Sequence, residues 1–318
     1  MSLLMAAMIA AAPIAAPVSQ PTAATLSQPI AAGSLAGTLA RPAGKAKATV
    51  LIIPGSGPTD RDGNNTLGVT AAPYRMLAND LAVKGIATVR IDKRGMFGSE
   101  AAGDPNAVTI GAYVADTAAW VSAARLATGA TCVWLAGHSE GGLVALASAH
   151  QPGVCGLVLI AAPGRPLDVI IRDQVAATAG NSPVVGQVDA ALTALKAGKH
   201  IDVTTMNPAL AKGLFNPKVQ NFLIDSFRLD PAALAKGASV PVLIVHGERD
   251  IQVSSADADR LKAAQPKAKL VVVPGMNHVL KLAPANRVGN AATYRDPSLP
   301  LAPGLVDAII AFVTVARK

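Results

Sequence analysis

The chain has 318 residues, of which 51% are hydrophobic and 15% charged, with a formal net charge of +8 and a sequence pI near 9.7. This composition supports a sizeable core and excludes a chain that is disordered throughout. The basic residues are dispersed and only 3% of residues are aromatic, so we expect no nucleic-acid partner. The diffuse positive charge would at most favour anionic substrates or a weak attraction to anionic membranes.

The first 28 residues are predicted to be a leader outside the folded domain. Residues 2–12 form an uncharged run of small and apolar residues, which Pro13, Pro17 and Pro21 then interrupt. This pattern is typical of a signal peptide, although no Lys or Arg precedes it. The run is too short for a secure membrane span, so we expect no stable insertion after signal removal. We therefore predict export to the periplasm or the medium, with a cytoplasmic protein as the alternative.

The most informative motif lies in the middle of the chain. The apolar run 132–136 favours a buried strand, and the run 142–147 has the apolar face of a helix. Between them lies Gly-His-Ser-Glu-Gly, at residues 137–141. G-x-S-x-G between a strand and a helix is typical of a nucleophile elbow, whose glycines permit a sharp turn that exposes the serine hydroxyl. We interpret Ser139 as the nucleophile; the alternative is a glycine-rich turn with a surface serine.

Residues 163–238 interrupt the alternation of strands. Apolar stripes with helical spacing run through residues 167–175, 188–195 and 219–227, and turn residues separate them. We predict a helical lid at this point. Four side chains are candidates for an acyl pocket or, more commonly, for a core: Met206, Phe215, Phe222 and Phe227.

Two apolar runs further along the chain, residues 240–245 and 269–273, predict two more buried strands. Asp250 follows the first run and His278 follows the second, so a carboxylate and an imidazole both lie C-terminal to Ser139. The order Ser, Asp, His is that of the α/β-hydrolase triad. Glu248 is a rival acid on the same loop as Asp250. Each residue alone is also compatible with an ordinary loop position, such as a helix cap or a solvated histidine.

On these motifs the chain resembles the α/β-hydrolase superfamily, from about Gly33 to the C-terminus. Within it, the chain is similar to bacterial short-chain carboxylesterases and serine aminopeptidase-like hydrolases with an inserted lid. The resemblance implies an α/β fold with a mostly parallel sheet flanked by helices and a lid between the sixth and seventh strands. It divides the chain into a leader (1–28), a first part of the core (29–162), the lid (163–238) and a second part of the core (239–318).

The resemblance also assigns an oxyanion hole. Residues 53–63, with the sequence IPGSGPTDRDG, are similar to a run in a subset of short-chain carboxylesterases. By this match the backbone N–H groups of Ser56 and Glu140 are the two donors. A proline stands where many relatives carry a histidine, so Gly57 stays open as the first donor. Residues 92–95 also resemble a family loop, which we interpret as structural rather than catalytic.

The two cysteines bear on the predicted compartment. Cys132 opens the strand that leads to Ser139, and Cys155 opens the next strand. In the α/β-hydrolase arrangement these strands are parallel neighbours, so both sulfur atoms would lie at the sheet end away from Ser139. A disulfide is then sterically possible and would suit an oxidising compartment. Two buried thiols in a reduced protein are an equally weighted alternative.

The function implied by this resemblance is the hydrolysis of small carboxylic esters through an acyl-enzyme, without a metal or organic cofactor. Ser139 would attack the substrate carbonyl, His278 would transfer protons, and Asp250 would orient the imidazole. A peptidase or amidase, a lactonase or a thioesterase would use the same three residues. A catalytically silent binding protein on the same fold is the alternative from a different class.

Overall fold

The computed structural model describes residues 26–179 and 182–315. In that part of the chain eight strands form one sheet in the order β1-β2-β4-β3-β5-β6-β7-β8. Neighbouring strands from β4 to β8 are parallel, whereas β2 runs antiparallel to both of its neighbours. The strands are β1 (Leu26–Ala32), β2 (Leu35–Arg41), β3 (Ala48–Ile53), β4 (Ile86–Ile91), β5 (Val133–His138), β6 (Val154–Ile160), β7 (Val242–Gly247) and β8 (Lys269–Val273). The mostly parallel α/β sheet predicted from the sequence is therefore confirmed.

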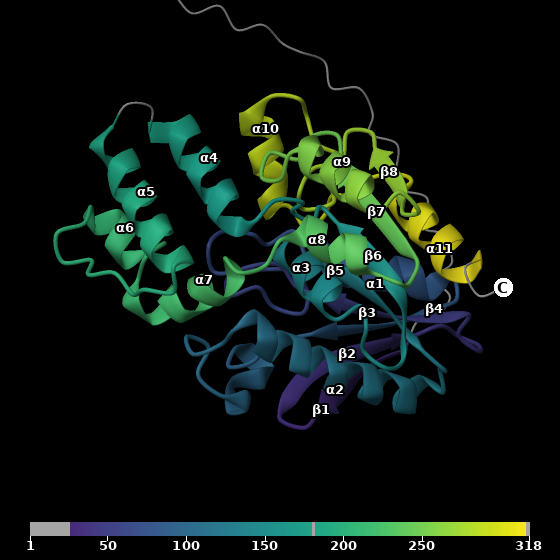
Figure 1. Cartoon of the computed structure of the whole chain (residues 1–318). Helices are drawn as coiled ribbons and strands as arrows, with labels where there is room; N and C mark the ends of the chain where they lie inside the picture. The colour runs from purple at the N-terminus through teal and green to yellow at the C-terminus, as the bar shows by residue number, and fades with distance from the viewer. Residues whose placement is uncertain (1–25, 180–181, 316–318) are drawn as a thin grey trace, which may run out of the picture.

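Helices cover both faces of this sheet (Figure 1). The helices are α1 (Pro73–Val83), α2 (Ile110–Thr128), α3 (Glu140–Ala147), α4 (Leu167–Ala179), α5 (Pro183–Lys196), α6 (Pro208–Lys212), α7 (Gln220–Ser226), α8 (Pro231–Gly237), α9 (Ser255–Ala264), α10 (Arg287–Ala292) and α11 (Leu305–Val315). Within the same described ranges, three short 3-10 helices accompany them: η1 (Phe97–Ala102), η2 (Pro217–Val219) and η3 (Thr293–Arg295). Alternate strand residues enter two cores: Leu135 packs with α2, α3, α8 and α9, and Trp134 packs with α1 and α11.

The first strand corrects the predicted boundary of the leader. β1 begins at Leu26, which pairs with Arg41, so residues 26–28 belong to the fold rather than to the leader. Pro29 lies in this strand, and β1 is at the edge of the sheet, where a residue without an N–H is tolerated. That proline obscured the strand in the sequence pattern. The rest of the predicted leader lies outside the described residues.

The chain between β6 and β7 forms α4 to α8. The helices α4 to α7 gather at one side of the molecule, whereas α8 packs against α3 and α9 (Figure 1). The first group has an apolar core of its own, which includes the fully buried Leu195 and Phe215. The carboxylate of Asp225 in α7 accepts a hydrogen bond of 2.7 Å from the N–H of Ile110 at the start of α2. The inserted helices are thus a small packed unit that is joined to the main sheet domain.

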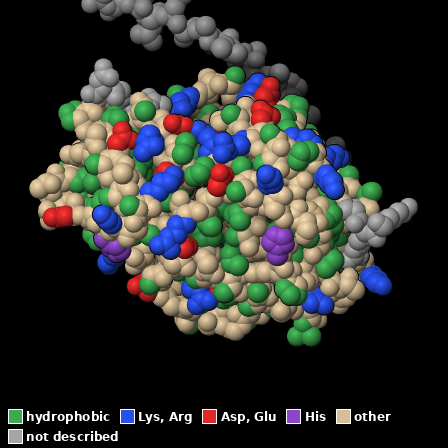
Figure 2. Space-filling model, viewed as in Figure 1, with side chains coloured by type: hydrophobic (Ala, Val, Ile, Leu, Met, Phe, Trp, Pro, Cys, Tyr) green, Lys and Arg blue, Asp and Glu red, His purple; other side chains and the backbone are tan. Residues whose placement is uncertain are grey.

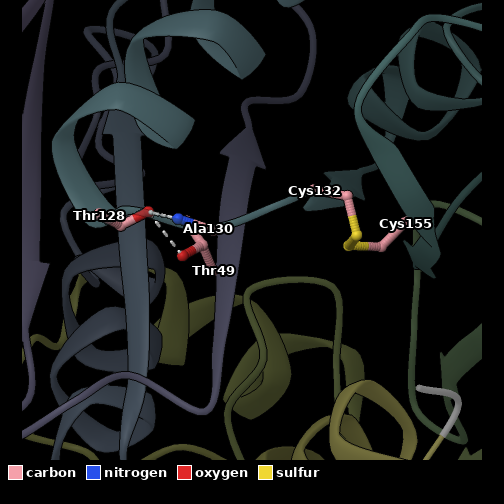
Figure 3. Close-up of a disulfide and its surroundings, with 5 residues drawn as sticks. All are labelled: Thr49, Thr128, Ala130, Cys132 and Cys155. Atoms are coloured by element: carbon pink, nitrogen blue, oxygen red, sulfur yellow. Dashed lines mark hydrogen bonds between the residues drawn. A yellow bond between two sulfur atoms is a disulfide. The ribbon is translucent and has the colours of Figure 1, made fainter. Parts of the chain in front are cut away.

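The two cysteines form a disulfide, with a Cα–Cα distance of 5.2 Å (Figure 3). Cys132 directly precedes β5 and Cys155 is the second residue of β6, so the bond lies at the N-terminal ends of these strands. At the same end of the sheet, the Thr49 hydroxyl donates a hydrogen bond of 3.0 Å to Thr128 Oγ1. Ser139 lies beyond the opposite end of β5, as the sequence predicted. The structure therefore decides between the two alternatives in favour of the disulfide.

The charged residues on the face seen in Figure 2 are of both signs. Lys and Arg side chains are spread over this face, with Asp and Glu side chains among them and apolar side chains between. In the described part of the chain, no helix combines the length and the apolar character that crossing a membrane requires.

Candidate active site

The G-x-S-x-G segment forms a sharp turn between β5 and α3. Ser139 has φ 54° and ψ −125°, a conformation that a residue with a Cβ adopts only where its surroundings impose it. A Cβ on Gly137 would lie 2.1 Å from the carbonyl oxygen of Gly141. A Cβ on Gly141 would lie 2.3 Å from the carbonyl oxygen of Ile53. Glycine is therefore required at both positions by close backbone approach, and the turn presents Ser139 between the strand end and the helix start.

Asp250 and His278 are hydrogen-bonded partners, although 28 residues separate them. Asp250 follows β7 and His278 follows β8, and Nδ1 of His278 lies 2.8 Å from Oδ2 of Asp250. The other carboxylate oxygen accepts the N–H groups of Gln252 and Val253 at 2.8 and 2.9 Å. Burial acts to raise the pKa of Asp250, but His278 and these N–H groups hold it below its ordinary value. Asp250 is thus an ionised carboxylate that orients the imidazole through Nδ1.

The rival acid Glu248 is used elsewhere. Its Oε2 accepts the N–H of Gly275 at 2.8 Å, which ties the loop after β7 to the loop after β8. Its own N–H donates to the carbonyl oxygen of Val273. The structure pairs His278 with Asp250 rather than with Glu248.

Ser139 and His278 line one cavity of about 80 Å³. Among the interactions of the described residues, no hydrogen bond joins the Ser139 hydroxyl to His278. Contacts between a nucleophile and its base are often long before substrate binds, and they tighten in the reacting complex. The three residues predicted from the sequence therefore meet at one place, with the contact between serine and histidine open.

A second histidine, His138, lies beneath these groups and was missed by the sequence reasoning. Its Nε2 lies 2.8 Å from the carbonyl oxygen of His278, and its Nδ1 lies 2.8 Å from the Tyr74 hydroxyl. A carbonyl oxygen only accepts, so Nε2 carries the proton and Nδ1 accepts from Tyr74. Burial, together with the nearby His278, lowers the pKa of His138 to about 3. His138 is therefore a neutral ring that connects the elbow to the loop of His278.

The two predicted oxyanion donors border the same cavity as Ser139. Ser56 follows β3, Glu140 is the first residue of α3, and both line a cavity of about 210 Å³ together with Ser139. The first N–H groups of a helix have no acceptor within the helix and lie at the positive end of its dipole. Ser56 borders both cavities that Ser139 lines, whereas Gly57 borders the larger cavity described below, which Ser139 does not line. This shared lining supports Ser56 rather than Gly57 as the predicted donor.

A buried ion pair adjoins these donors. Nζ of Lys93 lies 3.7 Å from Oε1 of Glu140 and donates a hydrogen bond of 2.9 Å to the carbonyl oxygen of Gly55. Burial raises the pKa of Glu140 and lowers the pKa of Lys93, and the attraction between the two charges opposes both changes. From the sequence, residues 92–95 are expected to be structural. That interpretation suits Asp92, which pairs with Arg61, but Lys93 reaches the site itself.

Two cavities meet at Ser56 and Glu140. The larger, of about 460 Å³, has mainly apolar walls that include Leu67, Met96, Val108, Tyr113, Ile171 and Phe222. The smaller, of about 210 Å³, shares Leu167 with the larger and is also bordered by Leu143, Pro163, Arg165, Ile170 and Val253. Of the four candidates for an acyl pocket, Phe222 lines the larger cavity. Phe215 and Phe227 are buried in the core of the inserted helices, and Met206 borders a separate hollow there.

No group of three or more His, Cys, Asp or Glu residues suited to a metal ion occurs in the described part of the chain. The strand order, the strained serine and the Asp250–His278 pair together define an α/β-hydrolase. The sequence model of the family described as serine aminopeptidase, S33, matches residues 66–282, and the chain belongs to this family.

The chain is also similar to individual proteins. It is 26% identical to esterase EstD of Thermotoga maritima over 251 residues, which cover 77% of this chain and 58% of that protein. The chain thus spans little more than half the length of this curated relative. The solved structures that share its fold include the following two. The complex of Est1E from Butyrivibrio proteoclasticus with ferulic acid has a TM-score of 0.54 and 15% identity, and covers 90% of this chain and 96% of that one. A serine hydrolase from Cycloclasticus zankles, a bacterium that degrades polyaromatic hydrocarbons, has a TM-score of 0.52 and 17% identity. This similarity covers 85% of this chain and 97% of that one.

Proposed function

We propose that this protein is a serine hydrolase that cleaves carboxylic esters through an acyl-enzyme intermediate. The observation that carries the proposal is the strained Ser139 in one cavity with the hydrogen-bonded pair of Asp250 and His278. Membership of the family and the similarity to a named esterase support it.

The geometry supports a two-step reaction. Nε2 of His278 takes the proton of the Ser139 hydroxyl while the serine oxygen attacks the ester carbonyl carbon. The N–H groups of Ser56 and Glu140 stabilise the resulting oxyanion. His278 then returns the proton to the departing alcohol, which leaves an acyl group on Ser139. In the second step His278 deprotonates a water molecule that attacks this acyl group, and the acid is released with Ser139 restored. Asp250 stabilises the imidazolium in both steps.

The cavities support an ester with one bulky apolar group. The larger cavity falls within the size range of small-molecule sites and has mainly apolar walls, so it suits the larger part of the substrate. The smaller cavity, which borders Ser139, would take the other part. We also propose that α4 to α7 are a lid, because Leu167, Ile171 and Phe222 from these helices line the larger cavity.

Aminopeptidase activity, which the family description suggests, receives less support from the carboxylates near the site. An aminopeptidase needs a free acidic group for the substrate amine. Asp62 pairs with Arg90, and Glu140 pairs with Lys93. Asp60 accepts two backbone N–H groups from its own loop. Asp62 and Glu140 are thus paired with cations and Oδ1 of Asp60 is used by its own loop, which favours an ester substrate.

Active-site labelling tests this proposal. The intact mass is measured before and after treatment with a fluorophosphonate, and initial rates are then compared on p-nitrophenyl esters of increasing acyl length and on aminoacyl p-nitroanilides. We expect one adduct that is absent in Ser139→Ala, and turnover of esters but not of anilides. An adduct that persists in Ser139→Ala, or ester turnover by that variant, would refute the assignment of the nucleophile.

We further propose that the protein is exported. Disulfides persist in oxidising compartments and are rare in the cytosol of mesophiles, so the bond between Cys132 and Cys155 supports this proposal. Fractionation of cells that express the full sequence, followed by non-reducing mass measurement, tests it. Full-length, reduced protein in the cytosol would contradict it.

A further inference from the structure

The buried ammonium group of Lys93 connects the two chain segments that carry the oxyanion donors. Its side chain is 6% exposed. It donates 2.9 Å to the carbonyl oxygen of Gly55 on the loop after β3, and lies 3.7 Å from the Glu140 carboxylate at the start of α3. It also lies 5.5 Å from the centre of the Tyr113 ring, which is part of the larger cavity. The reaction proposed above gives this charge no role.

Lys93 binds the carbonyl oxygen of the peptide group whose N–H, that of Ser56, is a predicted oxyanion donor. The carbonyl of Gly55 and the N–H of Ser56 belong to one planar trans peptide unit, so they point in opposite directions. A hydrogen bond that holds the carbonyl therefore also sets the direction of the N–H. The N–H of Gly55 is held separately, because it donates to the Tyr74 hydroxyl at 3.1 Å.

The loop at Gly55 has little room to move. A Cβ on Gly55 would lie 3.2 Å from the Cβ of Ser139, so the loop backbone passes close beside the nucleophile. A small rotation of the peptide would move the Ser56 N–H away from the place where the oxyanion forms. A cation on the carbonyl also polarises the amide, and this strengthens its N–H as a donor in a buried setting.

We propose that Lys93 is a positioning residue for the oxyanion hole, which aims and polarises the Ser56 N–H through the peptide between Gly55 and Ser56. This inference rests on the proposed serine hydrolase function. Glu140 compensates the buried charge of Lys93, since an unpaired ammonium at this depth would be costly.

Lys93→Met tests the inference, because it keeps the apolar stem and removes the donor. The expected result is a fall in kcat of roughly 10- to 100-fold, less than the loss of a whole oxyanion donor, with KM changed by no more than about twofold. Affinity for an alkyl trifluoromethyl ketone, whose hemiketal bears an oxyanion, should weaken in proportion to kcat/KM. If Lys93 only stabilised the fold, its loss would not weaken the affinity for the ketone in proportion to kcat/KM.

A matched control is Lys281→Met. Lys281 is also fully buried and donates to a backbone carbonyl, that of Leu299. It lies in the turn after His278, but it holds that turn through its own N–H and carbonyl, which bond to Asn277 and which Lys281→Met retains. This variant should lose stability while its kcat and its affinity for the ketone stay near those of the parent. An equal loss of kcat in both lysine variants would overturn the inference, because it would point to a general effect of removing a buried lysine.

In Lys93→Met the carboxylate of Glu140 loses its cationic partner. The double variant Lys93→Met/Glu140→Gln removes this unpaired charge, and it also serves as the test if the single variant does not fold. We expect the double variant to remain as slow as Lys93→Met, because the Gly55 carbonyl still lacks its donor. Recovery of kcat in the double variant would overturn the inference, as would parental kcat in Lys93→Met. Ester turnover by Ser139→Ala, measured in parallel, would instead refute the proposed function.

Discussion

Two regions border the same cavities and are built on different principles. The floor of the site, formed by residues 54–56, Lys93, 138–140, Asp250 and His278, is held by buried hydrogen bonds with fixed donors and acceptors. The wall, formed by α4 to α7, presents mainly apolar side chains. Hydrogen bonds are directional, whereas apolar contacts are not. Under the proposed function, the floor specifies where atoms react, and the wall specifies only the space that a substrate fills.

The wall is nonetheless anchored to the sheet domain. Before α4 the guanidinium of Arg165 makes two hydrogen bonds of 2.9 Å to the fully buried carboxylate of Asp257 in α9. At α7 the Asp225 carboxylate holds the N-terminal N–H of α2. Substitutions inside the wall should thus change which substrate is accepted, while those in the floor should change the rate of reaction.

The largest expected effect lies in the floor. Asp250→Asn should reduce kcat by about 10⁴-fold while leaving the fold intact, because the amide cannot stabilise the imidazolium and favours the wrong tautomer of His278. Steady-state kinetics with a p-nitrophenyl ester, together with thermal unfolding, measure both quantities. Glu248→Gln is the matched control, since its amide oxygen still accepts from Gly275. A severe loss in Glu248→Gln instead would show that the acid is misassigned.

Removing the disulfide should lower stability and leave the rate of reaction unchanged. Cys132→Ala/Cys155→Ala should lower the free energy of unfolding by about 3 kcal/mol, the loop-entropy value for a sequence separation of 23 residues. The kcat should be unchanged, because the bond lies at the sheet end opposite Ser139. Urea unfolding and ester kinetics on the double variant check this. A large fall in kcat would show that the floor depends on the far end of β5.

The neutral His138 makes the stability of the floor depend on pH. Its pKa is about 3 in the folded protein and near 6.5 when unfolded, so between these values only the unfolded chain binds the proton. Stability is therefore lost as pH falls, by about 2–3 kcal/mol from pH 6.5 to 4.5. The lowered pKa of Asp250 contributes in the same direction at lower pH.

Urea unfolding at pH 7 and pH 4.5 measures this dependence. In His138→Gln the amide has no proton to gain in this range, and the fall in stability should be distinctly smaller than in the parent. Curves of the same slope for parent and variant would argue against a neutral, buried His138.

The smallest expected effect lies in the wall. Phe222→Ala enlarges the larger cavity, so the KM for an ester with a bulky apolar group should rise about tenfold, while the acetate ester is affected much less. Phe227→Leu, in the core of the inserted helices, should lower the melting temperature without altering the preference between these esters. If both variants shift the preference equally, the wall does not act through direct contact.

The floor was only partly predictable from the sequence, for reasons that differ between residues. Ser139 was found because its motif is local, and Asp250 and His278 were found because each follows a readable strand. The roles of Tyr74 and Lys93 depend on strand order, which places the loops after β3, β4 and β5 side by side. No local sequence pattern predicts that strand order.

The wall was less predictable. Helical spacing indicated the inserted helices, but Phe215 and Phe222 have the same apolar character in the sequence, and only the packing shows that one is in a core and the other at a cavity. The disulfide stayed open for a related reason, because two cysteines on adjacent strands do not reveal the distance between them.

The bond between Cys132 and Cys155 closes a covalent ring around the segment that contains the elbow. A protease that cuts the backbone once inside this ring would leave one molecule of unchanged apparent size. A label on Ser139 would then migrate with both pieces until a reducing agent is added. Paired gels with and without thiol could therefore show whether a clipped chain still carries a reactive serine.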